Sequence, residues 1–328
     1  MTTNNSYLAF LQQFQGFVKS DVQLAPFTTF KIGGPADLFA EARTIEDLIA
    51  FVTSARTLEI PVTFLGGGTN ILISDKGIRG LVIRNLTQKI SIVGMKGAVF
   101  SGETSGEVYV EADSGVPMNK LVRYTVDEGL SGLEMHLGLP GTVGGALYMN
   151  SKWASPQGFV GDVVYQATIL ALNGEVKTVQ KRYFQFAYDS SILQKTHELV
   201  LRVVFKMKRG EKQYLWKIAN ESIAHRRNSQ PQGVFTAGCT FQNLSEGDAI
   251  TFQTPNHTKS AGYLIDHAGM KGRKIGQAVV SDVHANFIVN LGKARASDVL
   301  QLIALIKETV FSQFGVTLKE EIQFLGEF

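Results

Sequence analysis

Hydrophobic and polar positions near the N-terminus change their spacing twice, which predicts a small α/β unit. Thr44 is typical of a helix N-cap, because Asp47 follows it three residues later. Apolar residues then recur at helical spacing, and after Pro61 the apolar runs at 62–65 and 81–83 predict strands. The apolar face of the predicted helix carries Ile45, Leu48, Ile49 and Val52.

From about residue 90 the spacing is mainly that of strands, which predicts a second α+β region. Pro117 is expected to open a short helix that ends near Gly129. Residues 169–172 and 176–179 flank Asn173-Gly174, and this dipeptide is a strong hairpin signal. Further strands are predicted at 108–112 and 199–207.

The C-terminal third contains two predicted helices and one strand. Residues 215–225 predict a helix, and a loop rich in Gln, Pro and Gly follows over 228–238. Ser297 is predicted to cap a second helix that ends at Gly315, and residues 321–325 predict the last strand. The apolar face of this second helix carries Val299, Leu302, Ile303, Ile306 and Val310.

Length and composition exclude several classes of protein. A chain of 328 residues is too long for one ordinary core, so two or three domains are expected. A formal net charge of +3 is too small to indicate nucleic acid, and no apolar stretch approaches the ~18 residues of a membrane span. The single cysteine cannot form an internal disulfide, and the first 17 residues do not resemble a secretory signal. We therefore expect a cytoplasmic protein without nucleic-acid or membrane partners.

The six histidines are spread along the chain without the spacing of metal ligands, so no metal is expected. They lie at positions 136, 197, 225, 257, 267 and 284.

Two clusters of glycine are candidates for binding an anion. Three consecutive glycines after the predicted strand at 62–65 allow backbone N–H groups to converge on one point. A plain tight turn is the alternative, and the residues alone favour neither. This first cluster consists of Gly66, Gly67, Gly68, Thr69 and Asn70.

The second cluster, within residues 138–146, again offers convergent backbone donors and adds a rigid proline. Neither cluster fits the G-x-G-x-x-G fingerprint or the P-loop spacing. A phosphate-bearing cofactor is therefore expected on some fold other than a Rossmann domain or a P-loop domain. The cluster contains Gly138, Pro140, Gly141, Thr142, Gly144 and Gly145.

Both clusters, together with residues 29–35, resemble those of the UDP-N-acetylenolpyruvoylglucosamine reductase family. The blocks at 261–266, 284–290 and 318–326 resemble this family as well, so the likeness runs over nearly the whole chain. The resemblance implies an α+β fold, with a vanillyl-alcohol-oxidase-like (PCMH-type) two-part FAD-binding module and a C-terminal α/β substrate-binding domain. The implied parts are 1–85 with 312–328 returning to it, 86–207, and 208–311 for the UDP-sugar domain.

The resemblance also implies an activity in peptidoglycan synthesis. NADPH reduces a non-covalently bound FAD, a hydride then passes to the vinyl carbon of an enolpyruvyl UDP-sugar, and an acid protonates the neighbouring carbon. A monomer is expected. The chain is also expected to belong to the subtype without a tyrosine-bearing insertion, because the span 208–226 is too short to contain one. By the same likeness FAD is expected to contact Ile32, Gly33 and the two glycine clusters.

The proton donor of this family is usually a serine in an Ala-Gly-Ser-Phe-type loop, and Cys239 holds the matching position. A lone cysteine is most often a small buried hydrophobe, whereas the loop match favours catalysis. A thiol with a reference pKa of about 8.5 keeps its proton near neutral pH. Glu321 matches the second catalytic residue of the family. Glu320 beside it is expected to be a surface carboxylate on the opposite face of the strand.

Asp189 is the main departure from the family, which carries an arginine at this position to stabilise the intermediate. A carboxylate cannot stabilise developing negative charge as a cation does, so the chain departs here from the family's catalytic set. Lys152 is a candidate to supply the missing cation. The alternative, slightly favoured by the sequence alone, is an ordinary solvated lysine.

Substrate-binding residues are expected around position 230. Ser229 stands where the family has a substrate-binding lysine. Arg226 and Arg227 are candidates for binding the substrate diphosphate, since arginine suits phosphate oxygens, and a solvent-facing position is the alternative for either. Asn243 matches a family asparagine that contacts the substrate.

Two other functions remain open. One is a different FAD oxidoreductase of the same superfamily, acting on an alcohol or amine, although the blocks after Phe235 match the UDP-sugar domain. The other is a non-catalytic UDP-sugar binder, which Asp189 motivates. A flavin spectrum in the purified protein would argue against the binder.

Overall fold

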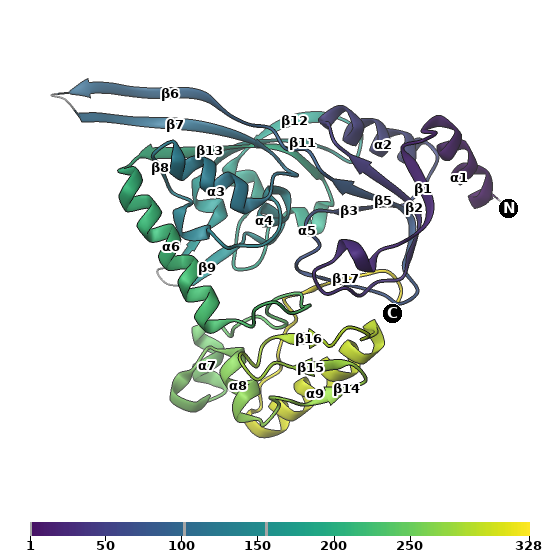
Figure 1. Cartoon of the computed structure of the whole chain (residues 1–328), viewed down its shortest axis with the longest axis vertical. Coiled ribbons are helices and arrows are strands. Elements are labelled where there is room, and N and C mark those ends of the chain that lie inside the picture. The colour runs from purple at the N-terminus through teal and green to yellow at the C-terminus, as the bar shows by residue number, and fades with distance from the viewer. Residues whose placement is uncertain (1, 101–102, 155–156) are drawn as a thin grey trace. The chain divides into compact units, whose positions relative to one another are not determined.

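The computed structural model describes residues 2–100, 103–154 and 157–328 (Figure 1). They form two compact units, each assembled from segments that lie far apart in the sequence. Unit 1 comprises Met1–Val18, Ala40–Gly67 and Ile83–Arg226, and unit 2 comprises Lys19–Phe39, Gly68–Val82 and Arg227–Phe328. The combination of helices and mainly antiparallel sheets confirms the α+β fold class. The three-part domain division stays a prediction.

The largest sheet lies in unit 1 and is antiparallel. Its strands are β6 (Ile90–Phe100), β7 (Glu103–Asp113), β8 (Leu130–Ser131), β11 (Val164–Leu170), β12 (Val176–Gln180) and β13 (Leu199–Arg209). The strand order is β12-β11-β13-β7-β6, with β8 paired to β13. The chain turns between β11 and β12 at Asn173-Gly174, where Gly174 has φ +88°, so the predicted hairpin is confirmed.

Three helices of unit 1 pack with this sheet (Figure 1). They are α3 (Met118–Asp127), α4 (Val143–Met149) and α6 (Lys212–Ser229). Met118, Leu121 and Val122 lie on one face of α3 and are fully buried, as helical spacing requires. They share one core with Val110 of β7 and Leu147 of α4. This core fixes the start of α4, which belongs to the second glycine cluster.

The N-terminal part supplies a second sheet and two helices. Its elements are α1 (Thr2–Gln13), β1 (Val18–Gln23), β2 (Pro35–Ala42), α2 (Ile45–Thr57), β3 (Val62–Leu65) and β5 (Ile78–Asn85). The sheet has the order β1-β2-β5-β3. Thr44 Oγ1 accepts the N–H of Asp47 at 3.0 Å, and the Asp47 carboxylate accepts the N–H of Thr44 at 2.9 Å. The predicted cap of α2 is therefore confirmed.

Unit 2 has its core between a small sheet and two helices. Its elements include α7 (Glu246–Thr251), α8 (Ala261–His267), β14 (Lys274–Ile275), β15 (Ala278–Val280), β16 (Ile288–Asn290) and α9 (Ala296–Phe314). Leu264 of α8 and Leu302 and Ile306 of α9 pack with Val280 and Ile288 of the sheet. The apolar face predicted for the last helix is therefore confirmed.

The start of α9 differs from the prediction. The helix begins at Ala296 with Arg295 as its N-cap, so Ser297 lies inside the helix and does not cap it. Asp75 Oδ1 accepts the N–H of Ala296 at 2.8 Å, and Asp75 Oδ2 accepts the N–H of Ser297 at 3.1 Å. This acceptor comes from a residue 221 positions away, which local spacing cannot reveal. Gly315 ends the helix with φ +68°, as predicted.

The closing strand is shorter than predicted. β17 (Gln323–Leu325) pairs in parallel with β4 (Ile71–Ile73). Glu320 forms an isolated antiparallel bridge with Phe241, and Glu321 lies between that bridge and β17, outside any strand. The strand predicted from residue 321 therefore begins two residues later, at Gln323, and the placement of Glu320 and Glu321 on opposite faces stays a prediction.

In the described part of the chain, no helix is both long and apolar enough to cross a membrane. Several short elements complete the fold. They are β9 (Lys152–Ala154), which pairs with β10 (Gln157–Phe159), α5 (Leu193–Thr196), and the 3-10 turns Ala25–Phe27, Glu134–His136, Val160–Val163, Lys181–Phe184 and Pro255–His257.

Candidate active site

The two glycine clusters touch each other inside unit 1. Gly66, directly after β3, lies against Thr142 of the second cluster. A Cβ added to Gly66 would stand 2.6 Å from Thr142 Oγ1, which is shorter than any normal contact. Glycine lets these two backbones approach closely, so the sequence's two candidate anion sites are brought together by packing.

The second cluster is half loop and half helix. Gly138 and Gly141 have φ +90° and +99°, a region that residues with a side chain rarely adopt. Pro140 between them is exposed. Thr142 is the N-cap of α4, and its Oγ1 accepts the N–H of Gly145 at 3.4 Å. The positive end of α4 and the glycine turn before it are together suited to negative charge.

Gly144 and Gly145 are neighbours in α4 but have different surroundings. Gly144 donates its N–H to the carbonyl oxygen of Ser114 at 2.8 Å, and a Cβ on it would lie 3.1 Å from Ser114 Cβ. Gly145 is exposed, and a Cβ on it would meet Thr142 Oγ1 at an ordinary 3.7 Å. Gly144 is thus required for packing, whereas Gly145 is open to a ligand.

In unit 2, Gly68 of the first cluster packs on residues 27–29. The carbonyl oxygen of Gly68 accepts the backbone N–H of Thr29 at 3.0 Å and its hydroxyl at 3.2 Å. A Cβ on Gly68 would stand 2.3 Å from the carbonyl oxygen of Phe27. Ile32 is 3% exposed and belongs to the core of unit 2, and Gly33 packs on Ile73. The side chain of Ile32 is therefore a core side chain, and only its backbone is left for the predicted contact with FAD.

Cys239 lies in an extended segment held between two other segments of unit 2. It is half-buried and forms an isolated antiparallel bridge with Phe287. The next residue, Thr240, donates its N–H to the carbonyl oxygen of Asn286 at 2.7 Å and accepts the N–H of Glu321 at 2.8 Å. The structure thus places Cys239 and Glu321 on adjoining backbone segments.

Asn286, to which the sequence gave no role, holds this segment in place. Its Oδ1 accepts the N–H of Phe241 at 2.9 Å, and its Nδ2 donates to the carbonyl oxygen of Phe241 at 2.8 Å. The side chain is 3% exposed, so both bonds are shielded from water. The only sequence signal was its place in the matching block at 284–290.

The two neighbouring glutamates differ in their partners. The carbonyl oxygen of Glu321 accepts the side-chain amide of Asn70 at 3.2 Å, which joins the first glycine cluster to the closing segment of unit 2. Glu320 is a partly exposed carboxylate, in agreement with the surface position that was expected. Its side chain is 26% exposed and forms an ion pair with Lys307 at 2.8 Å.

Lys152 and Asp189 form a tight ion pair in unit 1. Lys152 Nζ lies 2.6 Å from each carboxylate oxygen of Asp189 and 3.7 Å from the ring centroid of Tyr188. The exposed fractions of the two side chains are 20% for Lys152 and 3% for Asp189. The interpretation of Lys152 as an ordinary solvated lysine is therefore wrong. Tyr188 was missed as a partner of this cation.

Asp189 sits in a tight turn with left-handed backbone, φ +50°. The turn is closed by two backbone hydrogen bonds between Ala187 and Ser190, and Gln194 Nε2 donates to the carbonyl oxygen of Asp189 at 2.9 Å. Burial raises the pKa of Asp189, and the ammonium of Lys152 acts in the opposite direction. With an ammonium on both oxygens, we regard the carboxylate as the form present near neutral pH.

The two candidate arginines at the end of α6 have different surroundings. The Arg226 guanidinium lies 5.0 Å from the ring centroid of Trp153, and Arg226 Cδ would be 2.9 Å from a Cβ on Gly138. Arg226 therefore packs against the second glycine cluster, and Arg227 is exposed. Burial lowers the pKa of His136 to about 4, and the charge of Arg226 adds to this shift.

Asn243 is exposed in unit 2, and its Oδ1 accepts the N–H of Ala261 at 3.1 Å. This bond helps to start α8, so the side chain has a structural role beside any contact with substrate. Among the described residues, no group of three or more His, Cys, Asp and Glu side chains is arranged to hold a metal ion.

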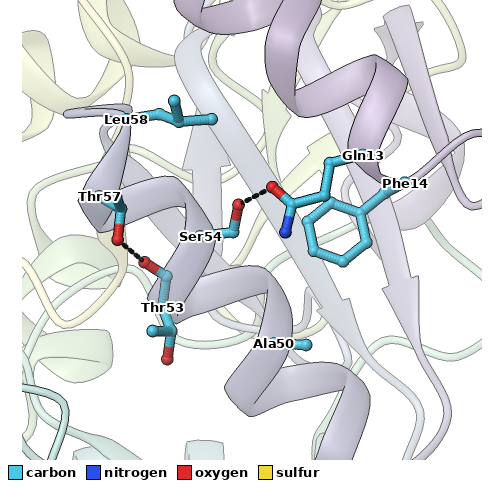
Figure 2. A pocket seen from close by; sticks show the side chains of 7 residues that line it. All are labelled: Gln13, Phe14, Ala50, Thr53, Ser54, Thr57 and Leu58. Carbon is cyan, nitrogen blue, oxygen red and sulfur yellow. Dashed lines mark hydrogen bonds between the residues drawn. The ribbon is translucent and has the colours of Figure 1, made fainter.

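A hollow of about 430 Å³ lies between α1 and α2 of unit 1, apart from these residues (Figure 2). Figure 2 shows Thr53, Ser54 and Thr57 among its lining residues, and Ser54 donates a hydrogen bond to Gln13 of the other helix. It holds no glycine cluster and no predicted site residue, so it is not the candidate site. It is lined by Gln13, Phe14, Ala50, Thr53, Ser54, Thr57 and Leu58.

Comparisons with known proteins agree with the geometry. A family model described as UDP-N-acetylenolpyruvoylglucosamine reductase, C-terminal domain, matches residues 230–325, and an FAD binding domain model matches residues 36–180. A UDP-N-acetylenolpyruvoylglucosamine reductase from Heliobacterium modesticaldum is 35% identical over 96% of this chain and 93% of that protein. The protein of the same name from Synechococcus elongatus is 36% identical over 94% of both chains.

A solved structure gives the same result. The crystal structure of UDP-N-acetylenolpyruvylglucosamine reductase from Thermus caldophilus is 32% identical, with a TM-score of 0.74 over 94% of this chain and 100% of that one. The expected arrangement of an FAD-binding module followed by a C-terminal domain is thereby confirmed. Since such relatives match nearly the whole chain, it is an FAD-dependent oxidoreductase and belongs to the UDP-N-acetylenolpyruvoylglucosamine reductase family.

Proposed function

We propose that this chain reduces UDP-N-acetyl-3-O-(1-carboxyvinyl)glucosamine to UDP-N-acetylmuramate in peptidoglycan synthesis, with NADPH as the reductant. The observation that supports this most is the adjoining placement of Cys239 and Glu321, which stand at the family's catalytic positions. FAD, when bound, relays a hydride from the nicotinamide to the vinyl carbon of the substrate.

The two glycine clusters are proposed to hold the cofactor. The contact between Gly66 and Thr142, which a single methyl group would disturb, supports an arrangement built for close backbone approach. The exposed Gly145 lets a diphosphate approach the positive end of α4 without meeting a side chain. Neither cluster contains a histidine or cysteine, so attachment without a covalent bond is proposed.

The substrate diphosphate is proposed to bind Arg226 or Arg227. Both stand at the C-terminal end of α6, beside the place where the family has a lysine. Arginine can donate two parallel hydrogen bonds to phosphate oxygens, so it can replace that lysine. Asn243 is proposed as a further contact with the UDP-sugar through its amide nitrogen, since its oxygen already accepts the Ala261 N–H.

Cys239 is proposed as the acid that protonates the carbon next to the substrate carboxylate. Its thiol is half-buried, and hydrogen bonds on both sides fix the backbone of its segment. Glu321 on the adjoining segment is proposed to orient the thiol or to share the charge. Glu321 is also the second candidate for the acid itself.

Product analysis tests the proposal. Purified holoenzyme is incubated with NADPH and the enolpyruvyl UDP-sugar, and the nucleotide sugars are separated and weighed by mass spectrometry. We expect NADPH oxidation in equal amount to a product two mass units heavier than the substrate. NADPH oxidation without such a product would point to another FAD oxidoreductase, and a colourless protein that binds UDP-sugars would point to the binder.

A cytoplasmic monomer without nucleic-acid or membrane partners remains part of the proposal. Light scattering of the holoenzyme at several concentrations measures the mass directly. A mass near 35.9 kDa at all concentrations supports the monomer, and a doubled mass contradicts it.

A further inference from the structure

Among the ion pairs described within unit 1, that of Lys152 and Asp189 has the least exposed cation and the least exposed carboxylate. The Asp189 side chain is 3% exposed, and both of its oxygens lie 2.6 Å from the ammonium. A buried ion pair stabilises a fold no better than apolar residues of the same volume, because both charges lose their hydration. Stability alone therefore does not explain the pair, whereas a function that requires a positive charge at this place would explain it.

The backbones on both sides of the pair are tied together. Asn150, two residues before Lys152, donates from Nδ2 to the carbonyl oxygen of Ala187 in the turn that carries Asp189, at 2.9 Å. Asn150 Oδ1 accepts the N–H of Gly161 at 3.1 Å, and the residue is 3% exposed. The ammonium is therefore held in one place by its own carboxylate, by the Tyr188 ring and by the fixed backbone.

The pair also stands close to the proposed flavin site within the same unit. α4 begins in the second glycine cluster and ends at Asn150, so Lys152 follows its far end. A helix of seven residues is about 10 Å long. Lys152 and the second glycine cluster therefore flank the two ends of one short helix.

The proposed reaction needs such a cation. When a hydride adds to the terminal vinyl carbon, the π electrons move onto the neighbouring carbon and its carboxylate. That end of the substrate then carries a second negative charge until the carbon takes a proton. A positive charge beside that carboxylate stabilises this state more than the substrate, because the state carries two negative charges there and the substrate carries one. A charge that is already fixed in place also needs no reorganisation during the reaction.

We propose that Lys152 supplies this positive charge by facing the substrate carboxylate, and that Asp189 and Tyr188 are the residues that position it. The inference rests on the proposed function. It also gives the aspartate at position 189 a role, since Asp189 would hold the cation in place without touching the substrate.

The test compares variants that do not leave a buried charge without its partner. The double variant Lys152→Met/Asp189→Asn removes both charges and keeps the side-chain shapes, and Lys152→Arg keeps the positive charge. Lys177 and Glu198 provide a matched control, because they also pair, at 3.0 Å, with a buried carboxylate side chain (7% exposed) and a tyrosine ring, that of Tyr183, near the ammonium. The control variant is Lys177→Met/Glu198→Gln.

Two readouts are measured on each holoenzyme. Rapid mixing follows flavin reduction by NADPH and flavin reoxidation by the enolpyruvyl UDP-sugar as separate reactions. Calorimetry measures the affinity for UDP-N-acetylmuramate, which has the carboxylate, and for UDP-N-acetylglucosamine, which lacks it. We expect the Lys152→Met/Asp189→Asn variant to reoxidise about 10²–10³-fold more slowly. We also expect it to bind UDP-N-acetylmuramate about 10- to 100-fold more weakly. Flavin reduction and affinity for UDP-N-acetylglucosamine should stay near the parent values.

Partial recovery in Lys152→Arg and normal behaviour of the control variant would complete the expected result. If Lys152→Met/Asp189→Asn reoxidises at the parental rate and binds both UDP-sugars normally, the pair is only structural and the inference is overturned. If the parent itself is not reoxidised by the enolpyruvyl UDP-sugar, the proposed function fails, and the inference fails with it.

Discussion

Gly66 and Thr142 lie so close that a Cβ on Gly66 would stand 2.6 Å from Thr142 Oγ1. The same oxygen accepts the N–H of Gly145 in the first turn of α4. A side chain on Gly66 would therefore displace the helix cap as well as any ligand, and loss of an N-cap typically costs about 0.5–2 kcal/mol. Loss of flavin in a Gly66 variant would not separate these two effects.

Gly145 allows the cleaner experiment. A side chain at this exposed position fits the protein, because its Cβ would be 3.7 Å from the nearest atom. We predict that Gly145→Val lowers the flavin content of the purified protein by blocking the approach of the cofactor. Gly247→Val is the control, since Gly247 is an exposed glycine in α7 with its nearest contact at 3.9 Å. Equal flavin-to-protein absorbance ratios in parent, Gly145→Val and Gly247→Val would contradict the proposed site.

The two arginines at the end of α6 can be separated by affinity for UDP. We predict that Arg226→Ala or Arg227→Ala weakens UDP binding about 10- to 100-fold, since a charge-assisted hydrogen bond is lost. Isothermal titration of each variant with UDP is the measurement, with Arg182→Ala as an exposed arginine control. Unchanged UDP affinity in both α6 variants would remove the two arginines from the substrate site.

His136 makes the fold sensitive to acid. The side chain is 1% exposed, and its Nδ1 has no hydrogen-bond partner among the described residues. Its folded-state pKa of about 4 lies below the unfolded value of 6.5, so the unfolded chain binds the proton first as the pH falls. Its contribution to stability is therefore present above about pH 6.5 and is lost between about pH 6.5 and 4.

We predict that this histidine alone costs about 2 kcal/mol of unfolding free energy between pH 7 and 5. His136→Leu should remove that part of the acid sensitivity. Urea unfolding of parent and His136→Leu at pH 7, 6 and 5 gives the comparison. Parallel losses of stability in the two proteins would show that His136 does not cause the effect.

Elements with local signals were predictable from the sequence. Thr44 and Asp47 form a cap within one helical turn, and Asn173 and Gly174 lie in a short hairpin loop between β11 and β12, so neither depends on distant residues. The cap of α9 was not predictable, because its acceptor Asp75 is 221 positions away. Ser297 satisfied the local rule and was displaced by this tertiary contact.

The candidate site shows the same division. The glycine clusters and Cys239 were found through short, ordered motifs. The ion pair of Lys152 and Asp189 joins residues 37 positions apart. The sequence showed only that the family's arginine is missing at position 189 and that Lys152 is a candidate cation. Burial of Asp189 decides that the lysine is held and not solvated, and burial of a single aspartate cannot be deduced from a motif.

Cys239 can be tested as the proton donor by separating the two half-reactions. General acid catalysis typically supplies about 10²–10⁴-fold, so we predict that Cys239→Ala slows flavin reoxidation by about that factor. Flavin reduction by NADPH needs no such proton and should be near normal. Cys239→Ser should retain much of the activity, because the hydroxyl takes the same position. Parental reoxidation in Cys239→Ala would make the thiol structural and Glu321 the next candidate for the acid.

The central claim is that the chain moves a hydride from NADPH through FAD to an enolpyruvyl UDP-sugar. An anaerobic titration of the yellow holoenzyme tests it most directly. We predict that NADPH bleaches the flavin absorbance and that the enolpyruvyl UDP-sugar then restores it with one equivalent, whereas UDP-N-acetylglucosamine, which has no vinyl group, does not. A flavin that NADPH bleaches but the enolpyruvyl UDP-sugar leaves reduced would contradict the account.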